Sequence, residues 1–210
     1  MKMKTTLYID AFNLYYGALK GTPYKWLNPL KLAQLILGEA HEVGVIKYFT
    51  ARVVSRPDNP GQLTRQLFYL RALRTLPGME IIFGHYLTHK VKMPLANPQL
   101  GTPRFAEVIK TEEKGSDVNL ASHLLVDAFD NAYDCAVLIS GDSDLAMPVE
   151  IVKSRFGKVV GVLNPQHKKC QRLSQTAVFY KHMRPSALEA SQFQDVIHDS
   201  HGVFNKPNEW

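Results

Sequence analysis

The sequence has little cysteine and no long hydrophobic run, and these absences exclude several classes of protein. Two cysteines, Cys135 and Cys170, occur in 210 residues, and their positions match neither a zinc-binding nor a redox motif. A disulfide framework is therefore excluded. No apolar segment approaches the ~18 residues of a membrane span. The lysine-containing N-terminus is not followed by the apolar segment of a secretory signal. We therefore expect a cytoplasmic protein without a membrane partner.

The first strand-like segment also lacks the glycine-rich turn of nucleotide-binding enzymes. Asp10-Ala11-Phe12-Asn13 follows this segment directly, where a dinucleotide-binding fold places its glycines. A P-loop motif is missing as well. Asp142-Ser143-Asp144 resembles the metal loop of haloacid-dehalogenase phosphatases. That chemistry needs a nucleophilic aspartate with a second acid two residues later, and no acid stands two residues after Asp10.

Basic residues are in excess. The chain has 25 Lys and Arg against 19 Asp and Glu, which gives a formal net charge of +6. A positive surface attracts phosphate chains and speeds encounter with them. The composition therefore favours a nucleic acid as partner.

Strand-like and helix-like segments alternate along the chain. Apolar, β-branched and aromatic residues predict strands over 5–9, 43–54, 79–87, 135–139 and 158–163. Helical spacing of apolar residues predicts helices over 30–37, 60–73, 117–129 and 145–155. This alternation predicts an α/β fold of three layers, Rossmann-like, with a mainly parallel sheet and helices on both faces.

Two segments interrupt the alternation. Residues 88–104 contain Pro94, Pro98 and Pro103, which predicts an inserted loop or arm. Residues 185–210 are polar after a short helical stretch, which predicts a C-terminal appendage that is partly disordered. We therefore expect one domain over 1–184. The arm and the appendage are candidate contacts for a protein partner or for a second copy of the chain.

Aspartates stand where predicted strands end. Asp10 closes the first strand, Asp142 and Asp144 follow the most apolar strand, and Asp117 begins a helix. In open parallel sheets, ligands bind at the carboxyl ends of the strands. Crowded carboxylates repel one another unless a cation lies between them, and oxygen ligands favour Mg²⁺ or Mn²⁺ over zinc. Each aspartate alone can also be a turn former or a helix cap.

Three sequence blocks contain these acids. They are Tyr8-Ile9-Asp10-Ala11-Phe12-Asn13-Leu14, Glu113-Lys114-Gly115-Ser116-Asp117-Val118-Asn119-Leu120-Ala121 and Ser140-Gly141-Asp142-Ser143-Asp144-Leu145. Together, in this order and spacing, they resemble the NYN domain family, specifically its bacterial LabA-like branch, within the PIN-like nuclease superfamily. The resemblance covers about residues 5–180. It implies a PIN-like fold and a nuclease that depends on Mg²⁺ or Mn²⁺ and usually acts on RNA.

The resemblance also implies roles for the acids, position by position. Asp10, Asp117 and Asp142 match the metal-binding acids of the family. Asp144 matches a further acid of the same motif. The resemblance therefore implies that these four residues form the catalytic metal site.

Other positions of the blocks match residues that support such a site. Asn13 matches an asparagine that orients the site, and Ser140 matches a hydroxyl residue that positions a carboxylate or the phosphate. Lys114 matches a basic residue that contacts phosphate or forms a structural ion pair. Relatives often carry another acid about two turns into the helix, where this chain has Ser122 and His123. A second tightly held metal is therefore not implied.

Basic residues outside the blocks are candidates for substrate binding. Arg52 and Arg56 follow a predicted strand, and Lys168 and Lys169 lie in a basic cluster late in the chain. Such residues can contact the phosphates of a nucleic acid or lie on a solvated surface.

Aromatic residues follow the first block closely. Tyr15, Tyr16, Tyr24 and Trp26 lie just beyond Asp10. Aromatic rings at the mouth of a site can stack on unpaired bases, whereas rings in the interior only pack in the core. The sequence leaves both interpretations open.

The acidic residues predict a metal-dependent nuclease that hydrolyses phosphodiester bonds. The resemblance implies that it acts as an endoribonuclease on single-stranded or structured RNA. The alternative is a catalytically weak NYN module that binds RNA or a protein partner without cutting. Retention of every acid in the three blocks favours the enzyme.

Overall fold

The computed structural model describes residues 2–55, 58–99, 101 and 103–210. Six strands form one parallel sheet in the order β3-β2-β1-β6-β7-β8. Their bounds are β1 (Met3–Asp10), β2 (His41–Thr50), β3 (Met79–Phe83), β6 (Cys135–Ile139), β7 (Val159–Asn164) and β8 (Phe179–His182). The predicted α/β class with a mainly parallel sheet is confirmed.

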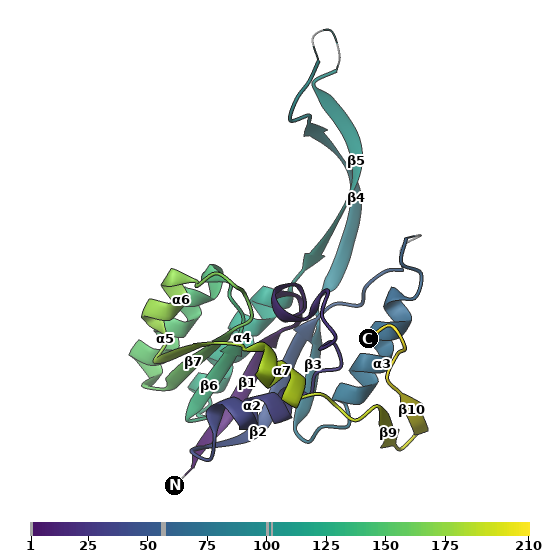
Figure 1. The fold of residues 1–210 in the computed structure, drawn as a ribbon. Coiled ribbons are helices and arrows are strands. Elements are labelled where there is room, and N and C mark those ends of the chain that lie inside the picture. The colour runs from purple at the N-terminus through teal and green to yellow at the C-terminus, as the bar shows by residue number, and fades with distance from the viewer. Residues whose placement is uncertain (1, 56–57, 100, 102) are drawn as a thin grey trace.

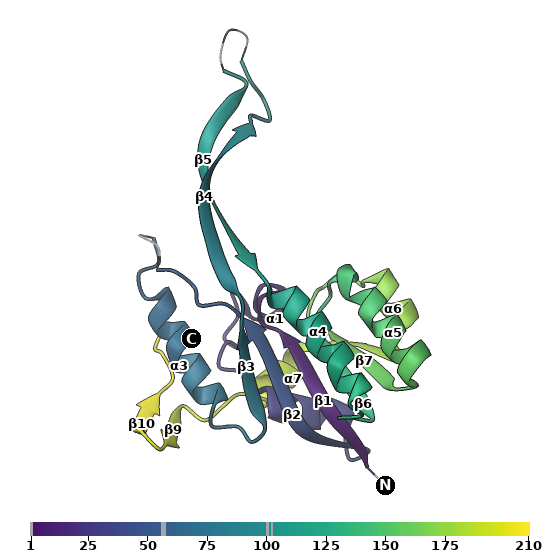
Figure 2. The same cartoon turned by 180° about the vertical axis from the view of Figure 1, so that it is seen from behind.

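Helices cover both faces of the sheet (Figure 1 and Figure 2). One face packs against α4 (Ser116–Phe129), α5 (Ala146–Phe156) and α6 (Gln171–Thr176), and the other against α2 (Pro29–Leu37), α3 (Gln62–Leu73) and α7 (Pro185–Ala190). Side chains alternate along a strand, so Leu7 and Ile9 pack toward α2 and α3, and Tyr8 packs toward α4. In the part of the chain that is described, no helix is long and apolar enough to cross a membrane.

Local sequence signals explain where several elements lie. Asn28 caps α2, because its Oδ1 accepts a hydrogen bond from the backbone N of Lys31 at 3.0 Å. Pro29 then occupies the first helical position, where its missing N–H costs nothing. The strand Cys135–Ile139 is buried at every position, as a strand covered on both faces requires. The predicted bounds of this strand are confirmed.

Two further strands form a long arm that projects from the body (Figure 1). They are β4 (His85–Pro94) and β5 (Phe105–Lys114), which pair in antiparallel fashion. The prediction of one strand over 79–87 is wrong, because the chain leaves the central sheet at Gly84. A Cβ at Gly84 would lie 2.4 Å from Glu113 Oε1 and 2.5 Å from Lys114 O, so the close approach of residue 84 to the end of β5 requires glycine.

The segment after residue 184 packs against α2 and α3. It comprises α7 and a hairpin of β9 (Val196–Asp199) and β10 (Gly202–Asn205). Arg71 of α3 donates hydrogen bonds to the Asp199 carboxylate at 2.6 and 2.7 Å. The ring centroid of Trp210 lies 5.6 Å from that of Tyr69. This segment therefore contributes contacts to the core beside α3.

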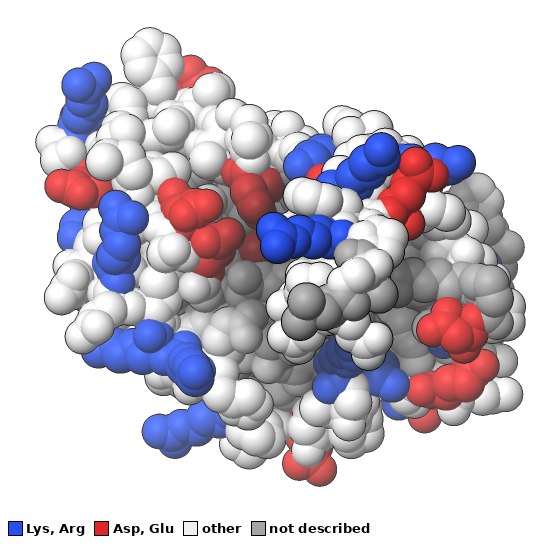
Figure 3. All heavy atoms as spheres, turned by 90° about the horizontal axis from the view of Figure 1, so that it is seen from above, with Lys and Arg blue, Asp and Glu red and all other residues white. Residues whose placement is uncertain are grey.

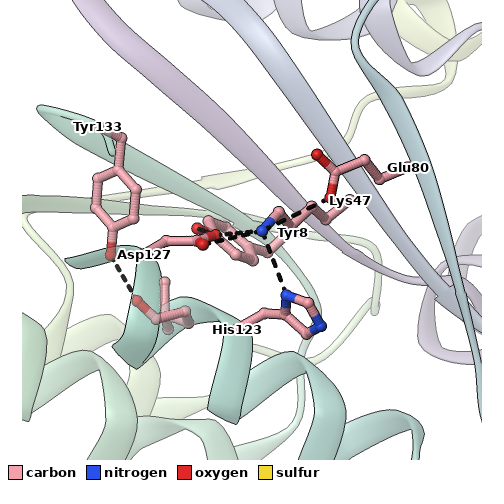
Figure 4. A network of polar contacts seen from close by, with 7 residues as sticks. Tyr8, Lys47, Glu80, His123, Asp127 and Tyr133 are labelled. Carbon is pink, nitrogen blue, oxygen red and sulfur yellow. Dashed lines mark hydrogen bonds and ion pairs between the residues drawn. The ribbon is translucent and has the colours of Figure 1, made fainter. Parts of the chain in front are cut away.

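A buried ionic network joins α4 to the sheet (Figure 4). Lys47 of β2 is 8% exposed, and its Nζ lies 2.7 Å from Asp127 Oδ2. The Tyr8 hydroxyl donates to the same carboxylate oxygen at 2.5 Å. Lys47 Nζ also lies 3.3 Å from His123 Nδ1. The network thus fixes the helix whose first turn contains Asp117.

Candidate functional site

Three of the predicted acids meet at the carboxyl edge of the sheet. Asp10 ends β1, Asp142 follows β6, and Asp117 lies in the first turn of α4. They line one open cavity of about 300 Å³, which we call the acidic pocket; its other lining residues are Phe12, Asn13, Tyr16, Tyr86 and Glu113. Seen from above, acidic side chains gather on this face with Lys and Arg side chains on several sides (Figure 3).

Asp10 is the most buried acid of the pocket. Its Oδ1 accepts a hydrogen bond from the backbone N of Asn13 at 2.9 Å and so caps α1 (Ala11–Leu14). Its Oδ2 accepts a hydrogen bond from Ser140 Oγ at 3.1 Å. Burial, together with the charges of Asp117 and Asp142, raises the pKa of Asp10 to about 6. The carboxylate therefore lies where a positive charge would stabilise it.

Ser140 and Asn13 hold the acidic segments together. The Ser140 side chain is fully buried, and its Oγ also accepts a hydrogen bond from the backbone N of Asp142 at 3.1 Å. Asn13 Oδ1 accepts hydrogen bonds from the backbone N of Gly141 at 2.9 Å and from Gln166 Nε2 at 3.0 Å. Both residues thus position the loop after β6 relative to the end of β1.

Asp142 combines a capping role with an open oxygen. Its Oδ1 accepts a hydrogen bond from the backbone N of Asp144 at 3.0 Å and caps the short 3₁₀ turn Ser143–Leu145. No described residue donates a hydrogen bond to its Oδ2. The cap interpretation and a functional role are therefore compatible, because they use different oxygens.

Asp144 lies beside the acidic pocket rather than in its wall. Its side chain is exposed, and it is not among the residues that line the cavity. Its charge nevertheless contributes to raising the pKa of Asp117. The structure thus brings three of the four predicted acids together and leaves Asp144 at the rim.

Asp117 has the least constrained carboxylate of the three, since no described residue donates a hydrogen bond to it. Burial is the main cause that raises the pKa of Asp117, and the charges of Asp142, Glu113 and Asp144 raise it further. A carboxylate with a raised pKa and free oxygens is suited to accept a proton or to bind a cation.

Glu113 is a pocket residue that the sequence reasoning missed. Its Oε1 accepts hydrogen bonds from the backbone N of Ser116 at 3.1 Å and from Ser116 Oγ at 2.7 Å. Gly115 holds the N-cap position of α4 with φ 97°. The signal for Glu113 was its place inside the second sequence block. Gln166, which donates a hydrogen bond to Asn13, was also missed. It follows β7 and lies in none of the three sequence blocks.

Of the predicted basic residues, Arg52, Lys114, Lys168 and Lys169 do not line the acidic pocket. Lys114 Nζ lies 3.7 Å from Glu112 Oε2, which matches the ion-pair interpretation. The Arg52 guanidinium lies 5.4 Å from the centre of the Phe83 ring. Lys168 and Lys169 are exposed on the loop after β7. Arg56 lies outside the described residues.

The aromatic residues beyond Asp10 divide between core and surface. Trp26 is fully buried, and its Nε1 donates a hydrogen bond to Gln194 O at 2.9 Å. Tyr24 is partly buried against the same core. Tyr16 is 58% exposed and lines the acidic pocket. Core packing is therefore the role of Trp26, whereas Tyr16 faces the site.

The donor set of the acidic pocket fits a partly hydrated Mg²⁺ or Mn²⁺ ion. Its ionic groups are carboxylates, and no Lys or Arg within the described ranges forms an ion pair with Asp10, Asp117 or Asp142. Among the described residues, no group of three or more His, Cys, Asp or Glu side chains is arranged to hold an ion by itself. Water molecules would therefore have to complete the coordination of an ion in this pocket. Mg²⁺ commonly keeps several waters and binds through one or two carboxylates, which such a pocket can supply.

The chain is similar to a known domain family and to two known proteins. The model of the NYN domain family matches residues 4–183. The chain is 30% identical over 236 aligned residues to the 6-hydroxy-3-succinoylpyridine 3-monooxygenase HspA of Pseudomonas putida, covering 99% of this chain and 75% of that protein. It shares its fold with a protein of unknown function from Vibrio parahaemolyticus, with a TM-score of 0.55 and 20% identity over 88% of this chain and 94% of the other. The chain belongs to the NYN domain family, within the PIN-like nuclease superfamily.

Proposed function

We propose that this protein is a Mg²⁺- or Mn²⁺-dependent nuclease that hydrolyses phosphodiester bonds of RNA at the acidic pocket. The observation that carries the proposal is the meeting of Asp10, Asp117 and Asp142 in one open cavity without a basic partner among the described residues. Membership of the NYN domain family supports it. Internal cleavage of single-stranded or structured RNA, as in the LabA-like branch, is the form of activity we propose.

The three aspartates would hold the cation directly or through water. When bound, the cation lowers the pKa of a water and offsets the charge that develops on the phosphate. Asp10 is fixed by its two hydrogen bonds, so it sets the position of the site. Glu113 supplies a further carboxylate at the wall, and Asp144 acts from the rim.

Asp117 is the group we assign to proton transfer, because its side chain lines the acidic pocket and its carboxylate accepts no hydrogen bond from a described residue. It accepts a proton from the water that attacks phosphorus in line with the leaving 3′ oxygen. The new bond joins the water oxygen to phosphorus, and the bond from phosphorus to the 3′ oxygen breaks. The 3′ oxygen takes a proton from solvent. The products are a 5′-phosphate and a 3′-hydroxyl, and the 2′-hydroxyl takes no part.

We assign phosphate binding outside the pocket to Arg52, Arg56, Lys114, Lys168 and Lys169. The net charge of +6 supports such contacts, because lysine and arginine bind the backbone without reading its sequence. Lys114 would exchange its ion pair with Glu112 for a phosphate.

The test is a cleavage assay with single-stranded and duplex RNA and DNA, in Mn²⁺, Mg²⁺ or EDTA. We expect RNA to be cut in either metal, with no cleavage in EDTA. Asp142→Asn, which is nearly isosteric, is the matched control and should lower the rate by orders of magnitude. Tight RNA binding without cleavage in any metal would overturn the proposal and support the non-catalytic alternative.

Two observations favour a second candidate function, the oxygenation of a nitrogen-containing aromatic ring. The Pseudomonas relative is named for oxygenating a substituted pyridine, and a cavity lined by several tyrosines adjoins the acidic pocket. The test is incubation with 6-hydroxy-3-succinoylpyridine, a two-electron reductant and ¹⁸O₂. Product that contains ¹⁸O would support this function, and recovery of unchanged pyridine would remove it.

A further inference from the structure

A second cavity adjoins the acidic pocket. It has a volume of about 100 Å³ and lies between η1 (Tyr15–Leu19), the carboxyl end of β2 and the first part of α3. We call it the aromatic pocket. Phe12 and Tyr16 line both cavities. A ligand group in the aromatic pocket would therefore be the immediate neighbour of a group in the acidic pocket.

Aromatic rings form much of the wall of this cavity. Tyr15 and Tyr16 come from η1, Tyr48 from β2 and Tyr69 from α3, and Trp210 lies beside them. The ring centroid of Tyr69 lies 6.2 Å from that of Tyr48 and 5.6 Å from that of Trp210. Flat walls of this kind stack well on planar rings.

Polar groups in the same cavity retain unused hydrogen-bonding capacity. Neither the Tyr48 hydroxyl nor the Gln62 amide forms a hydrogen bond with a described residue, and both side chains line the cavity. Gln66 differs, because its Oε1 accepts from the backbone N of Val53 at 2.9 Å and its Nε2 donates to Ala51 O at 2.8 Å. Tyr48 and Gln62 are thus available to bind the polar edge of a ring, whereas Gln66 supports the wall.

Positive charge lies at the same cavity. Lys25 and Arg65 are among its lining residues. Arg65 Nη1 lies 3.4 Å from Glu209 Oε1, and Lys25 Nζ donates a hydrogen bond to Glu209 O at 3.3 Å. The Glu209 side chain is 67% exposed. Another phosphate of an RNA strand can therefore replace this carboxylate beside Arg65 at little cost, while Arg65 Nη2 keeps its hydrogen bond to Asn59 Oδ1.

We propose that the aromatic pocket binds one planar nitrogen-containing ring, the base of a nucleotide whose phosphate then lies at the acidic pocket. The proposal rests on the proposed nuclease function in assigning that phosphate to the reaction. A cavity of about 100 Å³ admits a single ring but not a base pair. The pocket therefore selects an unpaired base, either in an RNA strand or in a free nucleotide.

The test measures binding separately from cleavage, in EDTA. The probes are uridine and adenosine 5′-monophosphates, a short single-stranded RNA and the same RNA with one abasic residue. The variants are Tyr15→Leu, which removes a stacking ring, and Gln62→Leu, which removes polar contacts near the start of α3. Phe129→Leu is the matched control, because Phe129 is 76% exposed on α4 and does not line the pocket. Thermal unfolding verifies that each variant is folded.

We expect Tyr15→Leu to weaken RNA binding by about tenfold or more, Gln62→Leu to weaken it severalfold, and Phe129→Leu to leave it unchanged. Competition by the monophosphates would show that a free nucleotide also enters. Binding of RNA alone, weakened by the abasic residue, would show that the ring must belong to a strand. Both outcomes support the proposal. Equal affinities of wild type, Tyr15→Leu and Gln62→Leu for every probe would overturn it.

The binding test of the aromatic pocket can fail without failure of the proposed nuclease function, and the reverse also holds. If the wild-type protein cuts RNA in Mn²⁺ while binding is insensitive to both pocket variants, this inference fails and the nuclease proposal stands. If binding depends on Tyr15 and Gln62 while no metal supports cleavage, the nuclease proposal fails and the ring site remains.

Discussion

Asp10 is a buried acid of the acidic pocket whose ionisation affects the stability of the fold. The residue is 5% exposed, and its burial raises the pKa of the carboxyl from 3.8 to about 6. The folded protein therefore holds this proton more tightly than the unfolded chain does. Ionisation of Asp10 thus lowers the free energy of unfolding as the pH rises from about 4 through 6, in the absence of a bound cation.

The variant Asp10→Asn cannot ionise at this position, so its free energy of unfolding should not fall with rising pH in the same way. A shift of about two pKa units corresponds to roughly 3 kcal/mol, so the variant should gain about that much stability relative to wild type between pH 4 and pH 7. Urea unfolding in EDTA at several pH values measures the difference. Any loss from the altered contact with Ser140 is independent of pH and leaves the slope unaffected. Parallel curves for the two proteins would contradict the account.

The positions of the acids could be predicted because two of them stand where apolar strands end. Asp10 and Asp142 follow buried apolar strands directly, so parallel pairing of β1 with β6 brings them to one edge. Asp144 was expected with them, but the turn that begins at Ser143 directs it to the rim. Gln166 could not be predicted, because its contact with Asn13 depends on how the loop after β7 folds back.

The position of α4 depends on the ionic network around Lys47. Removing one partner of a buried ion pair leaves a charge without compensation and costs about 3–5 kcal/mol. We therefore expect Asp127→Leu to destabilise the fold by roughly that amount. Lys47→Met together with Asp127→Leu should cost less than the sum of the two single changes. Urea unfolding of the three variants measures this, and strictly additive effects would contradict the coupling.

The base of the arm sets the position of Glu113. Gly84 leaves no space for a Cβ, since Glu113 Oε1 and Lys114 O would lie 2.4 and 2.5 Å away. Gly84→Ala should therefore displace β5 and cost about 1–3 kcal/mol, and it should also slow RNA cleavage. Gly44→Ala is the control, because a Cβ there meets no atom within 4 Å. Thermal unfolding and cleavage rates provide the readout; equal behaviour of the two variants would contradict this role.

Element positions were predictable where apolar patterns were long and ended sharply. The helix predicted over 117–129 and the strand predicted over 135–139 agree with the structure to within one residue. The division of 79–87 into two strands was not predictable, because it depends on the contact between Gly84 and the returning strand. The short α6 and β8 were missed, since the first is six residues and the second four, too short for a periodic signal.

At the scale of the whole molecule, alternation of strands and helices was enough to predict the layered α/β fold. Placement of the arm and of the segment 185–210 was not, because both depend on contacts between residues far apart in the chain. Asp199, for example, pairs with Arg71 across the packing of the hairpin on α3. Local patterns contain no information on such pairs.

The net charge of +6 predicts how RNA binding responds to salt. Contacts from Lys and Arg release counterions from the phosphates, so affinity should fall linearly with the logarithm of salt concentration. Changing Lys168 and Lys169 together to alanine should weaken binding of all sequences alike and reduce the slope by up to about two. Fluorescence anisotropy in EDTA over a salt series measures both. An affinity that does not change with salt would show that these side chains do not bind the backbone.

The most direct test of the central claim is the chemistry of the product ends. Single-stranded RNA is incubated with the protein and Mn²⁺ in H₂¹⁸O, with EDTA and Asp142→Asn as controls, and the fragments are analysed by mass spectrometry. Attack by water at the acidic pocket predicts fragments with a 3′-hydroxyl and a 5′-phosphate that has gained one ¹⁸O, and little product in either control. Fragments that end in a 2′,3′-cyclic phosphate, or equal cleavage in EDTA, would contradict the account.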